Sequence, residues 1–287
     1  MLHGFIFTAA VSMTNRLGFS SRLVVAGAVV FATGCSRSRS ERIDLGVARP
    51  RADAPGPSMP DESLRRSAEA EPLEFLRSCL ARYDHCVRGY TCRFVKKERI
   101  QGTWTAEQEM DVAFSERPFT VDMRWIRGAG RARRVVYIEG RWERNGKKMA
   151  RVELAGLPSI LPVYLDIYDS EMSAESRGAV DQFGFRQSLK RTIDLCERAR
   201  DDPRYELRFL GEETIDGRRC FLLERRLPFS GECGAYPDRL MRMYVDQESG
   251  VPLATLSFAD DEGKVLLGMY RFHDVVFHSE PFTAGEP

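Results

Sequence analysis

The chain has 287 residues, with 43 Lys and Arg against 42 Asp and Glu, and its formal net charge is +1. A polypeptide of this length holds one large domain, or one domain with a tail. The balanced charge excludes the strongly basic surface that nucleic-acid binding requires, so we expect no nucleic-acid partner.

The N-terminal segment has the layout of a secretory signal peptide. Arg16 and Arg22 precede a short apolar run over residues 23–32, and small residues follow the run. The run is too short to cross a bilayer, which needs about 20 apolar residues. The signal-peptide layout is complete whether translation starts at Met1 or at Met13.

Cys35 stands directly after the small residues of this segment. The arrangement resembles a bacterial lipoprotein signal, which implies that residues 1–34 are removed and that Cys35 is lipidated. The lipid on Cys35 would then attach the protein to a membrane, which is its expected partner. Ser36 follows the cysteine, and by the same resemblance this favours the outer membrane over the inner one. We therefore expect a protein of the bacterial cell envelope, lipid-anchored and facing the periplasm.

The next segment has the composition of a flexible linker. Residues 36–68 contain four prolines and no aromatic residue, and such a composition cannot bury a hydrophobic core. We predict a lipidated, disordered tether over residues 35–69, with a typical reach of roughly 30 Å. A single domain over residues 70–287 follows.

The first half of this domain is predicted to be one helix and a run of strands. Apolar residues recur at three- and four-residue steps from Leu73 to Val87, Pro72 suits a first helical turn and Gly89 ends the helix. Strict alternation of apolar and polar residues then predicts half-buried antiparallel strands. These strands cover residues 90–95, 110–114, 119–125, 135–139 and 149–154, with a hairpin turn at Asn145-Gly146.

The second half repeats this pattern after an irregular stretch over residues 155–180. A helix is predicted near Gln182 to Ala199, and alternation then resumes. The fold class is therefore α+β, a curved antiparallel sheet forming an incomplete β-barrel of about ten strands, covered by two or more helices. The later strands cover residues 205–209, 220–224, 240–246, 253–258 and 265–277, with a hairpin turn at Asp216-Gly217.

Six cysteines follow Cys35 in the sequence. An even number favours disulfides in an oxidising compartment, and the absence of a CxxC pair argues against a redox motif or a zinc ribbon. Cys92 and Cys220 both lie in predicted strands, so we hypothesise a disulfide between them if those strands are neighbours. The alternative is that several cysteines are buried free thiols.

Characteristic segments in the first half of the domain are Tyr90–Arg99, Glu116–Val121, Val136–Gly140 and Asn145–Met149. They resemble an uncharacterised domain that is common in planctomycete bacteria and is known by the unknown-function label DUF1571. The resemblance covers about Glu71 to Phe277. The closing segments are Tyr244–Leu253, Asp261–Gly263 and Tyr270–Val275. They resemble, more distantly, the lipoprotein-carrier superfold of LolA and LolB, which implies a helical lid over an apolar cavity and a lipid, acyl-chain or lipoprotein ligand.

The sequence contains no pattern typical of catalysis. The histidines after the signal segment lack metal-ligand spacing, and neither a nucleophile elbow nor a phosphate-binding loop occurs. We predict no catalytic residue, no metal and no cofactor, and a protein that is not an enzyme.

Aromatic and methionine side chains on the strand faces suggest a binding role. Methionine adapts to variable apolar partners, and barrel mouths are frequent ligand sites. The first hypothesis is a cavity that binds a lipid, acyl chain or lipoprotein. The alternative is a protein-interaction or envelope-sensor module with a solid core, which binds an envelope protein partner. The residues predicted to line the cavity are Phe94, Phe119, Met123, Trp125, Tyr244 and Phe258.

Overall fold

The structure is a computed structural model, and it describes residues 61–156, 162–169 and 176–279. The predicted signal peptide and Cys35 lie outside these residues, as does the tether up to residue 60. No helix within the described ranges is long and apolar enough to cross a membrane.

The described residues form three α-helices and a short 3-10 helix: α1 (Asp61–Ala70), α2 (Pro72–Cys86), η1 (Val180–Gln182) and α4 (Phe185–Ala199). Helix α2 lies where the apolar stripe predicted it, and α4 lies within the predicted range but begins at Phe185 instead of near Gln182. Helix α1 corrects the predicted extent of the tether, because residues 61–69 are helical. Leu64 and Ala68 of α1 are buried in the same cluster as Phe75 of α2, and this packing stabilises the helix.

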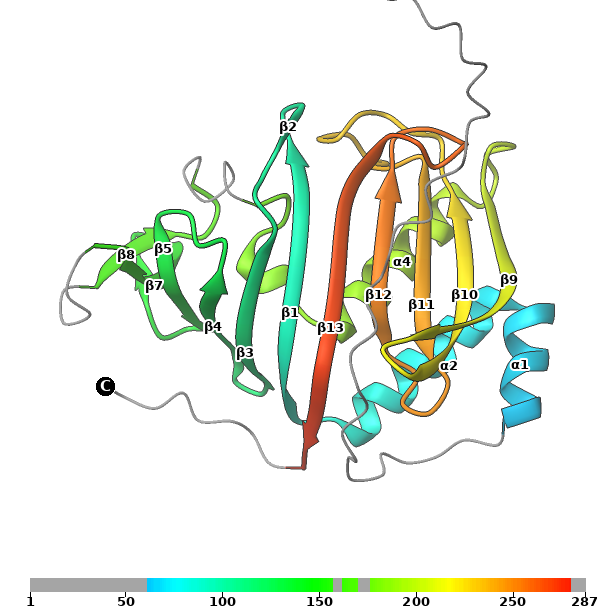
Figure 1. The fold of residues 1–287 in the computed structure, drawn as a ribbon, viewed down its shortest axis with the longest axis horizontal. Helices are drawn as coiled ribbons and strands as arrows, with labels where there is room; N and C mark the ends of the chain where they lie inside the picture. Colours follow the sequence, from blue (N-terminus) through cyan, green and yellow to red (C-terminus); the bar gives the residue numbers. More distant parts are fainter. Residues whose placement is uncertain (1–60, 157–161, 170–175, 280–287) are drawn as a thin grey trace, which may run out of the picture. The chain divides into compact units, whose positions relative to one another are not determined.

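The strands form one open antiparallel sheet (Figure 1), which confirms the predicted fold class. Its order is β6-β7-β5-β4-β3-β1-β13-β12-β11-β10-β9, while β2 pairs with β1 and β8 with β7. The strands are β1 (Gly89–Ile100), β2 (Thr103–Trp104), β3 (Gln108–Glu116), β4 (Phe119–Arg127), β5 (Ala132–Ile138), β6 (Glu143–Arg144), β7 (Lys147–Leu154), β8 (Val163–Asp166), β9 (Glu206–Ile215), β10 (Arg218–Arg226), β11 (Leu240–Asp246), β12 (Pro252–Phe258) and β13 (Leu266–His278).

Two predicted turns are confirmed by the backbone. Asn145 and Gly146 have φ values of 53° and 73°, and Asp216 and Gly217 have φ values of 51° and 81°. Both pairs join neighbouring antiparallel strands, β6 to β7 and β9 to β10. Left-handed conformation at two successive residues matches the twist of a hairpin, and Asn, Asp and Gly adopt it most readily.

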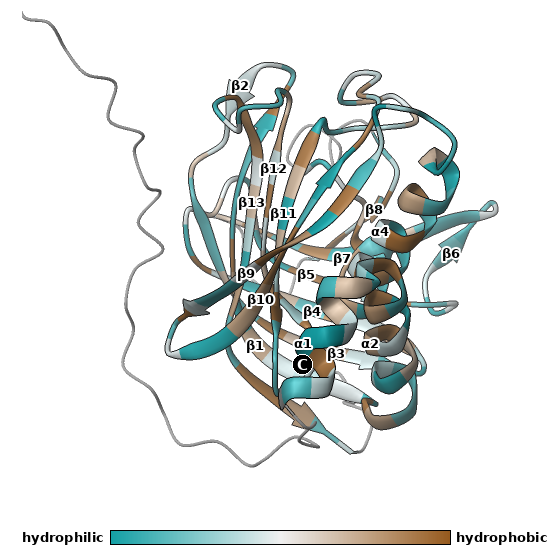
Figure 2. Cartoon of the chain, turned by 90° about the vertical axis from the view of Figure 1, so that its right-hand side faces the viewer, coloured by the Kyte–Doolittle hydropathy of each residue, from teal (hydrophilic) through white to brown (hydrophobic). Residues whose placement is uncertain are grey.

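The helices lie on one face of the sheet, which we call the inner face (Figure 2). Over β10 and β11 the inner face carries Phe221, Leu223 and Met243, and these pack with Phe75 of α2 and Leu189 of α4. By alternation, the side chains between them point to the opposite, outer face. The helices therefore bury one half of the inner face, and the other half extends over β1, β3, β4, β5 and β7.

Candidate functional site

The candidate site is a layer of aromatic rings on the inner face of β1, β3, β4 and β13. Phe94 of β1 lies 4.8 Å from Phe272 of β13, between ring centroids. Phe114 stacks on Tyr90 at 4.7 Å and meets Phe119 edge-on at 5.2 Å. We call these five residues the aromatic layer. Their side chains share one face because Tyr90 pairs with Phe114 of β3 and Phe94 pairs with Phe272 of β13, and directly paired residues of antiparallel strands point to the same side.

The connection between η1 and α4 closes the aromatic layer. Phe183 lies 5.1 Å from Phe94 and 5.8 Å from Phe272, between centroids. Phe185, the first residue of α4, lies 4.6 Å from Tyr90 and 4.5 Å from Phe272. Two rings from three consecutive residues therefore cover the layer on the side away from the sheet.

Gly184 allows this connection to approach the sheet. Its φ is +108°, and a Cβ atom there would lie 3.1 Å from the Tyr90 hydroxyl and 3.2 Å from the Phe114 ring. Glycine is the residue that tolerates both this backbone conformation and such close contact. The local sequence Phe183-Gly184-Phe185 thus places two rings against the layer.

A buried polar cluster continues the inner face of β1 beyond the aromatic layer. Lys96 donates a hydrogen bond of 2.7 Å from Nζ to Glu98 Oε2 and one of 3.0 Å to Ser176 Oγ. Glu98 Oε1 accepts the Tyr270 hydroxyl at 2.7 Å and the backbone N–H of Arg177 at 3.3 Å. Burial, reinforced by the Glu98 carboxylate, raises the pKa of Tyr270. This polar cluster fastens residues 176 and 177 to the sheet.

Four of the residues predicted to line a cavity lie on the inner face near this layer. Phe94 and Phe119 belong to the layer itself, and Met123 is buried in the same core cluster. Trp125 is half-buried and packs against that cluster, with its Nε1 donating a 3.3 Å hydrogen bond to Gln108 Oε1. These four side chains come from β1 and β4.

The other two predicted residues are placed differently. Met243 and Val245 lie in the cluster beneath the helices, so Tyr244 between them points to the outer face. Phe258 is buried, and the guanidinium of Arg242 lies 5.8 Å from its ring centroid. Both belong to the same hydrophobic cluster as the other four residues, although Tyr244 reaches it from the other face of the sheet.

The hypothesis of a Cys92–Cys220 disulfide is wrong in this structure, where both are free, buried thiols. Cys92 lies on β1 and Cys220 on β10, and β13, β12 and β11 separate the two strands in the sheet. A disulfide needs Cα atoms within about 7 Å, whereas adjacent strands alone are about 4.8 Å apart. Burial raises the pKa of the Cys220 thiol to about 12, which suits an inert thiol.

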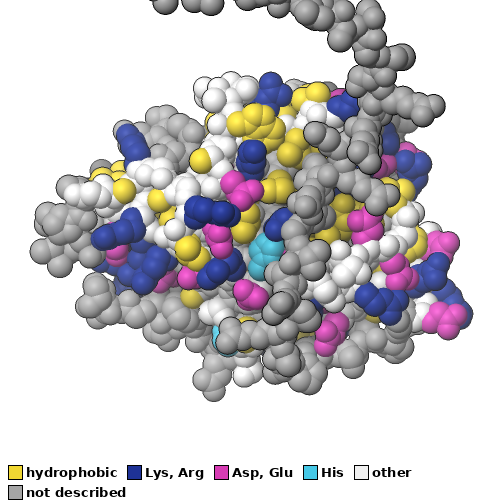
Figure 3. Space-filling model, viewed as in Figure 1, with side chains coloured by type: hydrophobic (Ala, Val, Ile, Leu, Met, Phe, Trp, Pro, Cys, Tyr) yellow, Lys and Arg dark blue, Asp and Glu magenta, His cyan; other side chains and the backbone are white. Residues whose placement is uncertain are grey.

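Over β1, β3 and β4 the outer face carries charged side chains around a hollow of about 340 Å³, which Asp274 of β13 borders. Figure 3 shows acidic and basic side chains interspersed on the face turned away from α2 and α4. Arg93 Nη2 lies 3.1 Å from Asp111 Oδ1, which pairs two of the charges in the hollow. The hollow is lined by Thr91, Cys92, Arg93, Asp111, Val112, Ala113, Asp122, Arg124 and Asp274.

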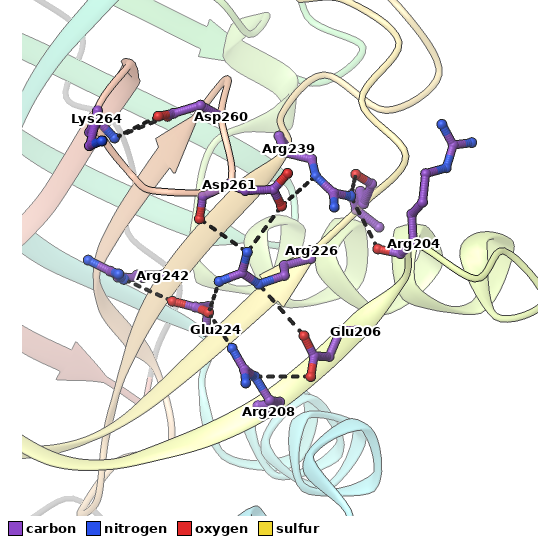
Figure 4. A network of polar contacts seen from close by, with 11 residues as sticks. Arg204, Glu206, Arg208, Glu224, Arg226, Arg239, Arg242, Asp260, Asp261 and Lys264 are labelled. Carbon is purple, nitrogen blue, oxygen red and sulfur yellow. Dashed lines mark hydrogen bonds and ion pairs between the residues drawn. The ribbon is translucent and has the colours of Figure 1, made fainter.

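A second polar feature joins β9, β10 and β11 (Figure 4). Glu224 is 3% exposed and accepts hydrogen bonds of 2.9, 2.8 and 3.1 Å from Arg208, Arg226 and Arg242. Arg226 also reaches Asp261 in the turn between β12 and β13, at 3.0 Å. One carboxylate therefore ties three strands together, and we interpret this network as structural.

Two parts of the candidate site were not predicted from the sequence. Phe183 was not singled out, although its place beside Gly184 and Phe185 was a usable signal. Lys96 and Glu98 were missed because charged residues are rarely buried, yet both continue the alternation of Phe94 along β1. Among the described residues, no group of His, Cys, Asp and Glu side chains could hold a metal ion.

The fold defines an α+β protein with an open, curved antiparallel sheet and a helical cover. The chain belongs to the family described as protein of unknown function DUF1571, whose profile matches residues 87–284. The resemblance to this family is thereby confirmed. No curated protein sequence matches the chain.

Several solved structures are similar at low sequence identity. The MucA/MucB complex of Pseudomonas aeruginosa is 17% identical, with a TM-score of 0.42 over 75% of this chain and 61% of that one. The chain thus spans less than two thirds of the matched MucB structures. The lipoprotein LppX of Mycobacterium tuberculosis is 14% identical, with a TM-score of 0.39 over 78% and 99%. A LolA superfamily protein of Nitrosomonas europaea is 10% identical, with a TM-score of 0.30 over 72% and 94%.

Proposed function

We propose that the protein is a bacterial-envelope protein, lipid-anchored at Cys35, whose domain binds an apolar chain against the aromatic layer. The ligand is the acyl chain of a lipid or lipoprotein, and the role is binding without catalysis. The observation that supports this proposal is the way the layer is closed. Phe183 and Phe185 cover it from a single short connection. Of α2, Tyr83 reaches this connection and meets Phe185 edge-on at 6.4 Å, whereas Phe75 and Leu76 pack in the helix-covered cluster.

The energetics allow an apolar chain to replace Phe183. Burying a methylene group is worth about 0.8 kcal/mol, and burying a whole phenylalanine side chain about 1.5–3 kcal/mol. Four or more methylenes laid against Phe94, Phe114 and Phe272 would therefore offset the displacement of the half-buried Phe183 ring. Trp125 and Met123 extend the apolar surface along β4, which suits a chain longer than one ring.

Binding of a fluorescent fatty acid tests this proposal. The full chain is titrated with the probe, and so is the Phe183→Ala variant, in which the competing ring is removed. We expect Phe183→Ala to bind the probe more tightly. Phe209→Ala is the matched control, because Phe209 is also half-buried but packs on Phe221 in the helix-covered cluster. The control should bind as the unchanged protein does.

A second candidate function is a protein-interaction or envelope-sensor module with a solid core. The observation that favours it is the filled state of the layer, in which the chain's own rings contact one another at 4.5–5.8 Å. On this alternative, the unchanged protein and both variants fail to bind the probe. Phe183→Ala then only lowers the stability of the fold.

A further inference from the structure

The end of the sheet farthest from β9 carries a projecting hairpin that the proposed function does not use. Figure 2 shows β6 extending away from the body of the domain. The hairpin and the adjoining β8 segment present cations and aromatic rings together. We call this set the β6–β7 tip; it comprises Arg141, Trp142, Arg144, Lys147, Tyr164 and Tyr168.

The β6–β7 tip is held in one conformation by its backbone. Asn145 and Gly146 form the turn, and the backbone N–H of Met149 donates a 2.8 Å hydrogen bond to the Trp142 carbonyl. Lys147 Nζ lies 3.2 Å from Asp166 Oδ2 of β8. The hairpin is therefore a preformed projection, and its side chains are presented without further ordering.

Two of the three aromatic rings of the tip are exposed, and the third, Trp142, is half-buried. Tyr168 is 56% exposed and Tyr164 is 40% exposed. Trp142 meets Tyr164 edge-on at 5.6 Å, and the guanidinium of Arg141 lies 5.2 Å from the Trp142 ring centroid. Trp and Tyr prefer the membrane–water interface, where the ring sits at the level of the lipid headgroups.

The charged side chains of the tip also suit the membrane–water interface. Arg141, Arg144 and Lys147 are exposed, and Glu143 lies between them on the hairpin. Lys147 pairs with Asp166 of β8, and the Tyr168 hydroxyl donates a 2.7 Å hydrogen bond to Asp181, so the two arginines are the outermost charges of the tip. Basic side chains beside aromatic ones bind the negative surface of anionic lipids. We propose that the β6–β7 tip rests on an anionic lipid bilayer, with its rings among the headgroups and its cations on the lipid phosphates.

The length of chain ahead of the described domain permits this contact. Roughly 25 residues separate Cys35 from Asp61, and a chain of that length extends at most about 85 Å. An anchored domain can therefore turn either end of its sheet toward the membrane. Binding of the tip to lipid would favour the orientation in which β6 faces the bilayer.

Quenching of Trp142 fluorescence by brominated lipids tests this inference. The full chain carrying Trp104→Phe and Trp125→Phe, with Trp142 as its one tryptophan, is mixed with vesicles of phosphatidylglycerol and brominated phosphatidylcholine, and tryptophan is excited selectively. We expect a loss of roughly half of the Trp142 emission, because bromine quenches only rings at lipid depth. Vesicles of brominated phosphatidylcholine alone should quench much less.

The chain offers matched controls for both the ring and the charge. Trp104 is 43% exposed and lies 5.4 Å from Lys97 Nζ, so a variant with Trp104 alone tests a similar ring elsewhere. Arg144→Glu with Lys147→Glu should abolish the quenching of Trp142. Arg66→Glu with Arg200→Glu, on exposed positions of the helical side, should leave it unchanged.

Two outcomes would overturn the inference. One is equal quenching of Trp142 and Trp104, which would mean that the tip has no preference for lipid. The other is quenching of Trp142 that ignores lipid charge and survives the reversal of Arg144 and Lys147. Neither outcome affects the proposed acyl-chain site, because the tip and the aromatic layer share no residue.

Discussion

At the scale of single residues, buried charges show how this sheet is held together. Burial alone would raise the pKa of Glu224, but hydrogen bonds from Arg226, Arg208 and Arg242 outweigh it and hold the pKa below its usual range. A carboxylate so placed is stabilised in its charged form. Glu224 therefore contributes to folding as an anion.

Replacing Glu224 with Gln should destabilise the protein by about 1–3 kcal/mol at pH 7, because a charged acceptor is lost while its arginines remain. Urea unfolding followed by circular dichroism measures the change. Glu206→Gln is the control, since its side chain is 45% exposed and exposed ion pairs contribute less than about 1 kcal/mol.

The loss of stability caused by Glu224→Gln is predicted to depend on pH. Because the folded-state pKa is lowered, the contribution of Glu224 is complete above the unfolded value of about 4.3 and is lost as the pH falls through the folded value. The difference between the unchanged protein and Glu224→Gln should therefore shrink in acid. A difference that stays constant from pH 7 to pH 3 would contradict this assignment.

At the scale of elements, local patterns predicted most helices and strands. The stripe from Leu73 to Val87 and the alternation at Tyr90, Cys92 and Phe94 gave the correct types because each depends on near neighbours in sequence. Helix α1 was missed because it has few apolar residues to form a stripe. Its burial depends on contacts of Leu64 and Ala68 with α2, which no local pattern reveals.

The connection between η1 and α4 makes a prediction at this scale. Gly184→Ala should destabilise the protein by about 1–3 kcal/mol, since a side chain at φ +108° is strained and its Cβ would crowd Tyr90 and Phe114. Gly102→Ala is the matched control, because Gly102 also has a positive φ of +82° but open space around its Cβ position. Equal unfolding free energies for the two variants would show that Gly184 is not packed as described.

At the scale of the whole molecule, the order of strands decided which sequence predictions held. Hairpin neighbours such as β3 and β4 follow from sequence, but the pairing of β1 with β13 joins residues about 180 positions apart. Two strands so far apart in sequence carry no local pattern that shows they pair. For this reason the pairing of Cys92 with Cys220 was wrong. Likewise, alternation gave the two faces of β11 but could not show that Tyr244 and Phe94 point to different faces.

Native mass spectrometry of the full chain purified from a bacterial envelope tests the central claim most directly. We predict reproducible adducts with the masses of lipids or fatty acids, because the aromatic layer accepts an apolar chain. Met123→Glu places a charge beside this layer, and a folded Met123→Glu variant should lose the adducts. A bare protein mass, for the unchanged protein as for the variant, would contradict acyl-chain binding and leave the protein-interaction module as the supported function.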